Sequence, residues 1–385
     1  MAAPKVPAAS AVGQLAHLID SPEIAELVRD LEATRWTGRP GYSIRAMVGM
    51  ALAKSLYAIP TWTRTVALVR EHDGVRLAIT GGGECPSVYA CYRFTAKLRQ
   101  YDDLLQACIG RVIAAVGCAG ENVAIDASDM PAYANGQRYV SKGGRERAPE
   151  EYSDPDATWG HRSAVSTRKG GGFYGYRLHM AVDTATDLPV AWSVQTASAH
   201  ESTMVAALLD KLHALGIQPG TVAMDKGYDI ERVYTETMER GAVPIIPLRE
   251  TTAVKRGDHK PPCCEHGEWR FAGADYQRQA TKWRCPTGEC KPASRWVKAD
   301  RLHPLIPRET PRFRSLYKRR GAVEREFGRL KNEWALAPLR VRGLDRVRLH
   351  ADLTILAKLA CGLLGRRATA AVEAGDQMLL GNAVA

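Results

Sequence analysis

The sequence SLYKRRGAVEREFGRLKNEW, residues 315–334, places charged and aromatic side chains at helical spacing. Four of them follow one another at offsets of 3, 4 and 7 residues, and on a helix with 3.6 residues per turn they project within an arc of about 60°. These four are Tyr317, Arg320, Glu324 and Lys331. One face of the helix is therefore predicted to present a carboxylate flanked by cations.

The same segment supplies an apolar stripe. Val323, Phe327 and Leu330 lie together on one side of a helix, which is typical of a surface that faces a protein core. We therefore predict one long helix over residues 311–334, with Glu326 on its solvated side.

The charge of the chain is concentrated around this helix. The 385 residues carry a formal net charge of +11, and the pI is about 9.2. Residues 311–350 contain twelve Arg or Lys and four Asp or Glu, a surplus of eight positive charges. Such a basic surface indicates a polyanionic partner, although a solvated basic helix would have the same composition.

Upstream of this helix, short apolar runs alternate with amphipathic ones. The strand-like runs are VAIDAS (123–128), FYGYRLHMAVD (173–183), LPVAWSVQT (188–196), TVAMD (221–225) and AVPIIPL (242–248), and the helical runs are ESTMVAALLDKLHALG (201–216) and IERVYTETMERG (230–241). The polar stretch 136–172, rich in Gly and Arg, is typical of a mobile loop. Strands that alternate with helices predict an α/β core over residues 118–367.

Two carboxylates follow the apolar runs of this core. Asp126 lies at the end of VAIDAS and Asp225 at the end of TVAMD. Binding and catalytic sites of open α/β sheets are built at strand ends, so both residues are candidates. Asp is also a common turn residue after a strand, and position alone leaves both interpretations open.

The first 117 residues contain amphipathic helical runs and no competing strand pattern. The runs are PEIAELVRDLEA (22–33), YSIRAMVGMALAKSLYA (42–58) and TWTRTVALVREH (61–72). A Gly-rich break then precedes a basic helical run that carries Arg93 and Lys97. This order predicts an all-helical N-terminal domain with a helix-turn-helix-like DNA reader, in which Arg93 and Lys97 contact DNA. A helical packing domain with ordinary surface bases is the alternative.

A polar segment interrupts the core between about residues 250 and 307, and we predict that it is a β-rich insertion. Its thiol and imidazole groups suit tetrahedral Zn²⁺. The possible ligands are Cys264, His266, Cys285 and Cys290, with Cys263 as an alternative. Their spacing departs from the common C-x2-C pairs, so chance clustering of reduced thiols is the other interpretation. Residues 368–385 are predicted to form a loose tail.

The helix motif resembles the Y-x2-R-x3-E-x6-K signature of the DDE transposases of bacterial insertion sequences. Tyr317, Arg320, Glu324 and Lys331 match it at every position, and AIDAS, GYRLHMAVD and MDKGYD extend the resemblance to about residues 20–365. The resemblance implies an RNase-H-like mixed-sheet core. It also implies that Asp126, Asp225 and Glu324 are catalytic and bind two Mg²⁺ or Mn²⁺ ions.

The resemblance further implies DNA contacts beside these acids. Arg320 and Lys331 would bind phosphates, and Tyr317 would hydrogen-bond a phosphate oxygen. The alternative is helix-surface packing and a salt bridge to Glu324, because a base four residues before an acid commonly pairs with it. In relatives that form DNA hairpins, a Trp of an inserted segment stacks on a flipped base. Here Trp269, Trp283 and Trp296 are more readily assigned to the core of the insertion.

The expected reaction is metal-dependent strand cleavage and strand transfer at the ends of a mobile element. The expected partner is double-stranded DNA, both the terminal inverted repeats and the target, bound by a homodimer. A nuclease of the same fold without joining activity and a non-catalytic DNA-binding repressor are the alternatives. The N-terminus lacks the pattern of a signal peptide, and no apolar run approaches the roughly 18 residues of a membrane span, so a cytoplasmic location is expected.

Overall fold

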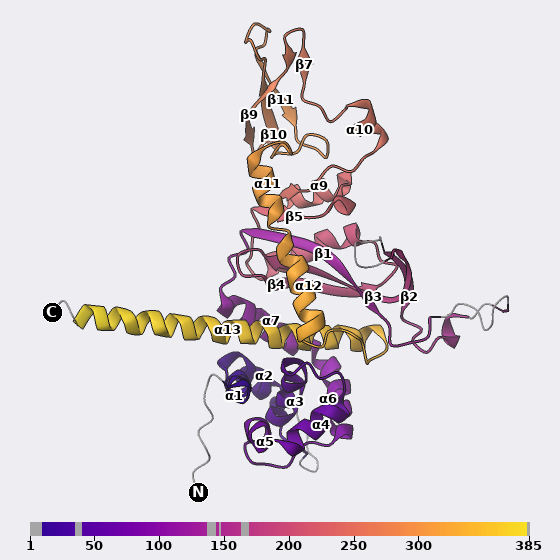
Figure 1. Cartoon of the computed structure of the whole chain (residues 1–385), viewed down its shortest axis with the longest axis vertical. Helices are drawn as coiled ribbons and strands as arrows, with labels where there is room; N and C mark the ends of the chain where they lie inside the picture. Colours follow the sequence, from indigo (N-terminus) through magenta and orange to yellow (C-terminus); the bar gives the residue numbers. More distant parts are fainter. Residues whose placement is uncertain (1–9, 35–40, 137–143, 146–147, 163–168, 383–385) are drawn as a thin grey trace.

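The computed structural model describes residues 10–34, 41–136, 144–145, 148–162 and 169–382. The chain is a mixed α/β protein in which a helical region, a central sheet and a β-rich projection follow one another along the long axis (Figure 1). The predicted combination of a mixed sheet and helices is confirmed.

All described elements before residue 117 are helices. They are α1 (Ala11–Ile19), α2 (Pro22–Ala33), α3 (Ile44–Leu56), α4 (Trp62–Glu71), α5 (Asp73–Thr80), α6 (Val88–Leu98) and α7 (Asp102–Val116). Ser10, Ser43, Thr61 and Ser87 begin four of them, because each side chain accepts a backbone N–H three residues on. The connection between α5 and α6 covers residues 81–87, longer than the typical 3–4-residue turn of a helix-turn-helix.

The central sheet is mixed. Its strands are β1 (Asn122–Pro131), β2 (Thr158–Arg162), β3 (Gly171–Asp183), β4 (Leu188–Thr196), β5 (Thr221–Ala223) and β6 (Val243–Ile245). The strand order is β2-β3-β1-β5-β6, and β4 also pairs with β3. β1, β3 and β4 are antiparallel neighbours, whereas β5 and β6 run parallel to β1. Gly175 is required in β3, because a Cβ there would lie 2.4 Å from the carbonyl oxygen of Met130 in β1.

Helices pack on this sheet, and one of them also contacts the helical region. α8 (Val205–Ala214) and α9 (Glu231–Glu239) pack on each other and on β4 and β6, and α12 (Gly321–Glu333) packs on β1 and β3. α13 (Leu344–Asn382) runs between the sheet and the helical region (Figure 1), where it contacts β4, α7 and α3. One continuous hydrophobic core therefore extends across both regions. None of the described helices has an apolar stretch long enough to cross a membrane.

The predicted single helix over residues 311–334 is wrong in one respect. The structure has two helices that run end to end, α11 (Pro311–Lys318) and α12, with a turn at Arg319–Arg320 between them (Figure 1). Backbone N–H groups at this junction bond three residues back, as in Arg320 to Tyr317 at 3.0 Å. Gly321 begins α12, and the low helix propensity of glycine favours an interruption there.

The apolar stripe of α12 is confirmed, but the predicted solvation of Glu326 is wrong. Val323, Phe327 and Leu330 are buried. Glu326 is buried with them, and burial raises its pKa to about 7. Position 326 follows Val323 by three residues and precedes Leu330 by four, so it belongs to the buried face despite its charge.

The insertion is β-rich, as predicted. It contains α10 (Thr252–Arg256), the two-stranded ladder β7 (Cys263–Cys264) and β8 (Gly267–Glu268), and a three-stranded sheet of β9 (Arg270–Asp275), β10 (Ala280–Arg284) and β11 (Ser294–Lys298). Trp269 and Trp283 form its core with Cys285, whereas Trp296 is 45% exposed. The core assignment is thus confirmed for two of the three tryptophans.

Asp229 anchors the base of the insertion. Its buried carboxylate accepts hydrogen bonds from the backbone N–H of Arg249 and from the Arg301 side chain, both at 2.7 Å. Arg308 donates to Tyr234 Oη at 2.6 Å in α9. Both ends of the insertion are therefore attached to the segment that follows β5.

Two further predictions differ from the structure. The polar stretch 136–172 contains β2, which pairs with β3, although residues 137–143, 146–147 and 163–168 lie outside the described residues. The loose tail predicted from residue 368 is wrong as far as Asn382, because α13 continues to that residue. Ala, Glu, Gln, Met and Leu are frequent in this stretch and have high helix propensity.

Replacing Asp352 in α13 with asparagine is expected to flatten the pH dependence of stability. Asp352 accepts a hydrogen bond from Trp192 Nε1 in β4 at 2.6 Å, and burial is the main reason that its pKa rises from 3.8 to about 6. The folded chain therefore keeps a proton that the unfolded chain has lost. The resulting stability is fully present below about pH 3.8 and is lost as the pH rises through about 6, a change on the order of 3 kcal/mol.

Urea denaturation of wild type and Asp352→Asn between pH 4 and 8 measures this effect as the difference between two profiles. Asp345→Asn is the matched control, because Asp345 lies in the same helix with a side chain that is 73% exposed. Its profile should run parallel to that of the wild type. Parallel profiles for Asp352→Asn as well would contradict the assignment.

Candidate active site

Asp126 lies in the middle of β1 and not at its end as predicted, whereas Asp225 follows the carboxyl end of β5, which runs parallel to β1. The register of β1 and β5 pairs Val123 with Val222 and Ala124 with Ala223. Asp126 and Asp225 each follow the second pair by two residues, so they reach the same level of the sheet. The two carboxylates are close enough for their charges to interact, since Asp225 is one of the groups that raise the pKa of Asp126.

Backbone N–H groups fix one oxygen of each aspartate. Ala127 N–H donates to Asp126 Oδ1 at 2.8 Å, and Gly227 N–H donates to Asp225 Oδ1 at 2.7 Å. A Cβ at position 227 would lie 2.9 Å from Asp225 Oδ1, so only glycine leaves this carboxylate in place. Both side chains are therefore positioned by the local backbone before any ligand binds.

α12 brings a third carboxylate to the same place. Arg320, at the start of α12, donates from Nη1 to Asp126 Oδ2 at 3.0 Å and from Nη2 to Glu324 Oε1. The Arg320 and Asp126 side chains are only 17% and 19% exposed, whereas Glu324 is 57% exposed. One guanidinium thus bridges the strand acid and the helix acid. The three predicted carboxylates thus lie in one region of the structure, but their oxygen atoms do not all lie within 4.8 Å of one another.

Several carboxylates lie close enough together in this site for their negative charges to interact. Burial is the main reason that the pKa of Asp126 rises to about 7, and the charges of Asp225 and Glu201 raise it further. The Ala127 N–H and Arg320 act in the opposite direction. Burial lowers the pKa of Arg320, but the carboxylates of Asp126 and Glu324 outweigh this and raise it. The site therefore favours bound positive charge.

Sequence reasoning missed a second group beside these acids. Arg177 in β3 lies 3.3 Å from Asp129 Oδ1 and 3.4 Å from Glu201 Oε1. Burial raises the pKa of Glu201, which lies close enough to Asp126 and Asp225 for their charges to interact. Glu201 follows β4 after a polar stretch, so a search for acids directly after apolar runs passes over it.

Two aromatic side chains with unsatisfied polar atoms lie in this part of the fold, and Tyr228 is the one close to the acids. Tyr228 is buried, and its hydroxyl has no hydrogen-bond partner among the described residues. Burial, followed by the charges of Asp126, Glu201 and Asp225, raises its pKa well above 10. His179 pairs with Ala127 across the sheet, and burial lowers its pKa to about 4, so the ring is neutral near pH 7.

The other residues of the helix signature make contacts within the chain. Lys331 Nζ donates to Ser128 Oγ and to the carbonyl oxygen of Asp129, both at 2.7 Å. Tyr317 stacks on Phe313 with ring centroids 6.2 Å apart, and the Arg320 guanidinium lies 5.9 Å from the Tyr317 ring. The predicted alternative, packing and salt bridging, thus describes the contacts that these side chains make in the structure.

The predicted DNA-contacting residues of the helical region lie elsewhere. Arg93 and Lys97 are exposed on α6, which lies on the far side of α13 from α12 (Figure 1). Arg93 packs over the Tyr89 ring at 4.8 Å, and Lys97 lies 5.8 Å from the Tyr101 ring. They do not join the acidic site.

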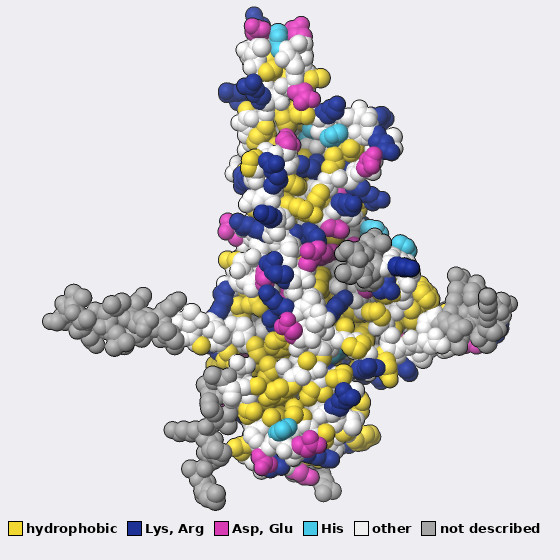
Figure 2. Space-filling view, in the orientation of Figure 1, with side chains coloured by type: hydrophobic (Ala, Val, Ile, Leu, Met, Phe, Trp, Pro, Cys, Tyr) yellow, Lys and Arg dark blue, Asp and Glu magenta, His cyan; other side chains and the backbone are white. Residues whose placement is uncertain are grey.

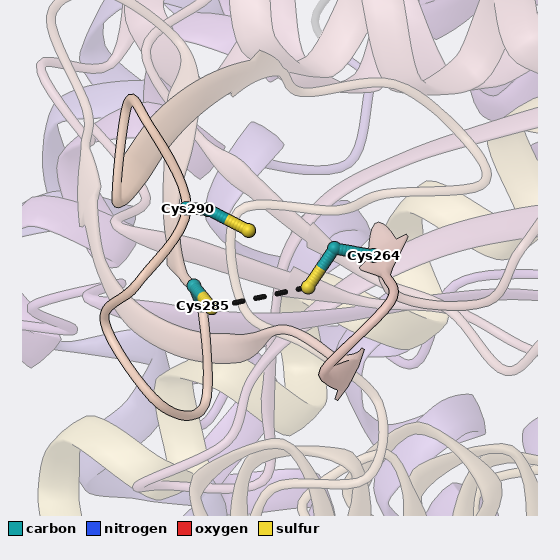
Figure 3. A group of neighbouring side chains, drawn as sticks. All are labelled: Cys264, Cys285 and Cys290. Carbon is teal, nitrogen blue, oxygen red and sulfur yellow. Dashed lines mark hydrogen bonds between the residues drawn. The ribbon is translucent and has the colours of Figure 1, made fainter.

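The predicted zinc ligands are brought together in part. The sulfur atoms of Cys264, Cys285 and Cys290 all lie within 4.8 Å of one another (Figure 3). His266 is outside this group, with Nδ1 3.5 Å from Glu289 Oε2. Cys263 is exposed.

The carboxylates fit divalent cations with a preference for oxygen. Asp126, Asp225 and Glu324 offer hard oxygen donors, which are the ligands that Mg²⁺ and Mn²⁺ select. Lys and Arg side chains are spread along the face of the molecule over α11 and α12 (Figure 2), so the acids are surrounded by a basic surface. This arrangement suits metal-assisted chemistry on a polyanion.

Comparison with known proteins identifies the family of this chain. Residues 119–359 match the family model of the transposase DDE domain. Among solved structures, a piggyBac transposase synaptic complex with hairpin DNA aligns with 91% of this chain and 74% of its own chain, at 12% identity and a TM-score of 0.39. At this TM-score the overlap is too small to establish a shared fold. No curated protein matches the chain significantly. Because the family model spans well over half of its length, this chain belongs to the transposase DDE domain family.

Proposed function

We propose that this chain is the transposase of a mobile element of the bacterial insertion-sequence type, and that it acts on DNA in the cytoplasm. It cuts DNA strands at the element ends and joins the exposed 3′-hydroxyl to target DNA. The observation that carries this proposal is the placement of Asp126 in β1 beside Asp225 after β5, with Arg320 joining Asp126 to Glu324 in α12. The strand order β4-β3-β1-β5-β6 supports an RNase-H-like core.

The three carboxylates would hold two divalent ions, Mg²⁺ or Mn²⁺. When bound, such ions activate the attacking oxygen and stabilise the leaving oxygen of a phosphodiester. The protein's own contribution is rigid placement. Backbone N–H groups hold one oxygen of each aspartate, and the packing of α12 on β1 and β3 sets the position of Glu324.

Arg320 is suited to two successive roles. Its guanidinium neutralises Asp126 and Glu324 by direct contact. Once those carboxylates are engaged by cations, its planar fork becomes available for a phosphate, which it fits in a bidentate manner. Lys331 would contribute a point charge beside it, and Tyr317 a hydroxyl for a phosphate oxygen.

Two surfaces would guide DNA. Four cations of α11 and of the turn that joins it to α12 are exposed: Arg312, Arg314, Lys318 and Arg319. α6 presents a stripe of exposed side chains at helical spacing, formed by Tyr89, Tyr92, Arg93, Ala96 and Lys97. We propose that this stripe binds the terminal inverted repeats, with Arg93 and Lys97 on phosphates or base edges. Two element ends must meet, so a homodimer on DNA is expected.

Replacing any of the three acids with its amide should abolish cleavage while DNA binding persists. Asp126→Asn, Asp225→Asn and Glu324→Gln are each expected to lose far more than the roughly 10–100-fold typical when a group that only supports a metal ligand is changed. The assay is cleavage and joining of DNA that carries the sequences flanking the gene, with Mg²⁺ or Mn²⁺.

Glu326→Gln is the matched control, since it removes a carboxylate from the same helix that faces the core instead of the site. It should retain cleavage. Cleavage that persists in any of the three amide variants would refute the assignment. Nicked DNA without joined product would favour the nuclease, and shifted but uncut DNA would favour the repressor.

Removing the cations of α6 should weaken DNA binding without changing the chemistry. For Arg93→Ala and Lys97→Ala, the slope of log affinity against log salt is expected to fall by about 1 for each phosphate that the variant no longer neutralises. Gel-shift titrations at several salt concentrations measure this. Arg232→Ala removes an exposed cation of α9 and should leave the slope unchanged. Equal effects of all three variants would argue against a specific role for α6.

A further inference from the structure

The insertion has too small a core to explain its order by hydrophobic burial alone. Its own cluster of buried side chains consists of Trp269, Trp283 and Cys285, with Cys264, Cys290 and Val297 packed against it. Small units with so little core usually need a metal or a disulfide for stability. The three cysteines of this cluster are the groups able to provide such a link.

Their sulfur atoms are arranged for a shared ion. Cys264 ends β7, Cys285 follows β10, and Cys290 lies in the loop before β11 (Figure 3). The Cys264 and Cys285 sulfurs are 3.8 Å apart. Two sulfurs that bind tetrahedral Zn²⁺ at about 2.3 Å would be separated by about 3.8 Å, whereas a disulfide brings them to about 2.05 Å. The spacing therefore matches two ligands of one metal.

The loop between β10 and β11 supplies two of the three sulfurs, those of Cys285 and Cys290. In the same loop, Thr287 Oγ1 lies 3.5 Å from the Cys285 sulfur, a contact in which either atom can be the donor.

The positions of the two candidates favour His266 over Cys263 as the fourth ligand. Successive residues of a strand face opposite ways, so Cys263 is directed away from the side that Cys264 occupies, and it is exposed. His266 lies in the turn between β7 and β8, two residues after Cys264. Its Nδ1 is 3.5 Å from Glu289, the neighbour of Cys290, and its Nε2 is 3.5 Å from Glu265. A metal-binding histidine usually keeps a carboxylate on one ring nitrogen, so zinc would take the place of one of these two acids.

We propose that Cys264, Cys285 and Cys290, with His266 as the fourth ligand, bind a structural zinc ion. The ion joins the β7–β8 ladder to the loop between β10 and β11 and stabilises the insertion. Four protein ligands leave no open position, so this zinc takes no part in the chemistry of the carboxylate site. The two sites also lie in different parts of the molecule (Figure 1).

The test is metal analysis of the full-length chain purified under reducing conditions. Wild type is expected to contain one zinc per chain by inductively coupled plasma mass spectrometry. Cys285→Ser and Cys290→Ser should lose it, and His266→Ala should weaken zinc binding by more than about tenfold in chelator competition. Cys263→Ser is the matched control and should retain one zinc per chain.

Titration of the metal-stripped wild type with Co²⁺ keeps the test valid if a variant fails to fold. Absorption bands from thiolate to cobalt are expected at one equivalent and should be displaced by Zn²⁺. Chelation should also expose residues 250–307 to limited proteolysis. Wild type without zinc and without a cobalt signal would overturn the proposal, as would a Cys264–Cys285 disulfide. Loss of zinc in Cys263→Ser would overturn the ligand assignment.

Discussion

Repulsion between carboxylates is the constraint on which the rest of the structure depends. Two unit charges 4 Å apart interact by about 4 kcal/mol at the effective dielectric near a protein surface, more than a typical hydrogen bond contributes. The fold opposes this repulsion at Asp126 by direct means: a backbone N–H on one oxygen and the Arg320 guanidinium on the other. Burial is the main reason that the pKa of Asp126 is nevertheless raised, and the charges of Asp225 and Glu201 add to it. A cation beside these carboxylates would reduce the repulsion between them.

The elements of the site could be predicted because each has a local sequence pattern. The spacing of Tyr317, Arg320, Glu324 and Lys331 needs only the helical period, and VAIDAS and TVAMD are short enough to be recognised as strands. The turn at Arg319–Arg320 escaped prediction because tight helical turns preserve nearly the same period as an α-helix. Charge alone predicts the wrong side for Glu326, because its position between Val323 and Leu330 puts it on the buried face.

Contacts between residues that are far apart in the sequence could not be predicted from such local patterns. The shared level of Asp126 and Asp225 depends on the parallel pairing of β1 with β5, two strands nearly a hundred residues apart. Glu201 enters the site only because β4 returns beside β3 and brings the following turn close to Arg177. Convergence of the cysteines likewise needs the fold of the insertion, since Cys264 and Cys285 are 21 residues apart. These contacts are consequences of topology, and a single sequence does not encode them as local patterns.

The motif MDKGYD connects the acidic site with the insertion. Asp225 belongs to the site, and Asp229, four residues later, holds Arg249 and Arg301 at the two ends of the insertion. The chain leaves the insertion through Arg308, which bonds to α9, and enters α11 directly. α11 leads in turn to Arg320 and Glu324. A short stretch of the chain, residues 308–324, therefore connects the base of the insertion with the third carboxylate. The proposed sulfur site of the insertion and the proposed oxygen site of the core are compatible in one chain, because thiolates and carboxylates select different metals.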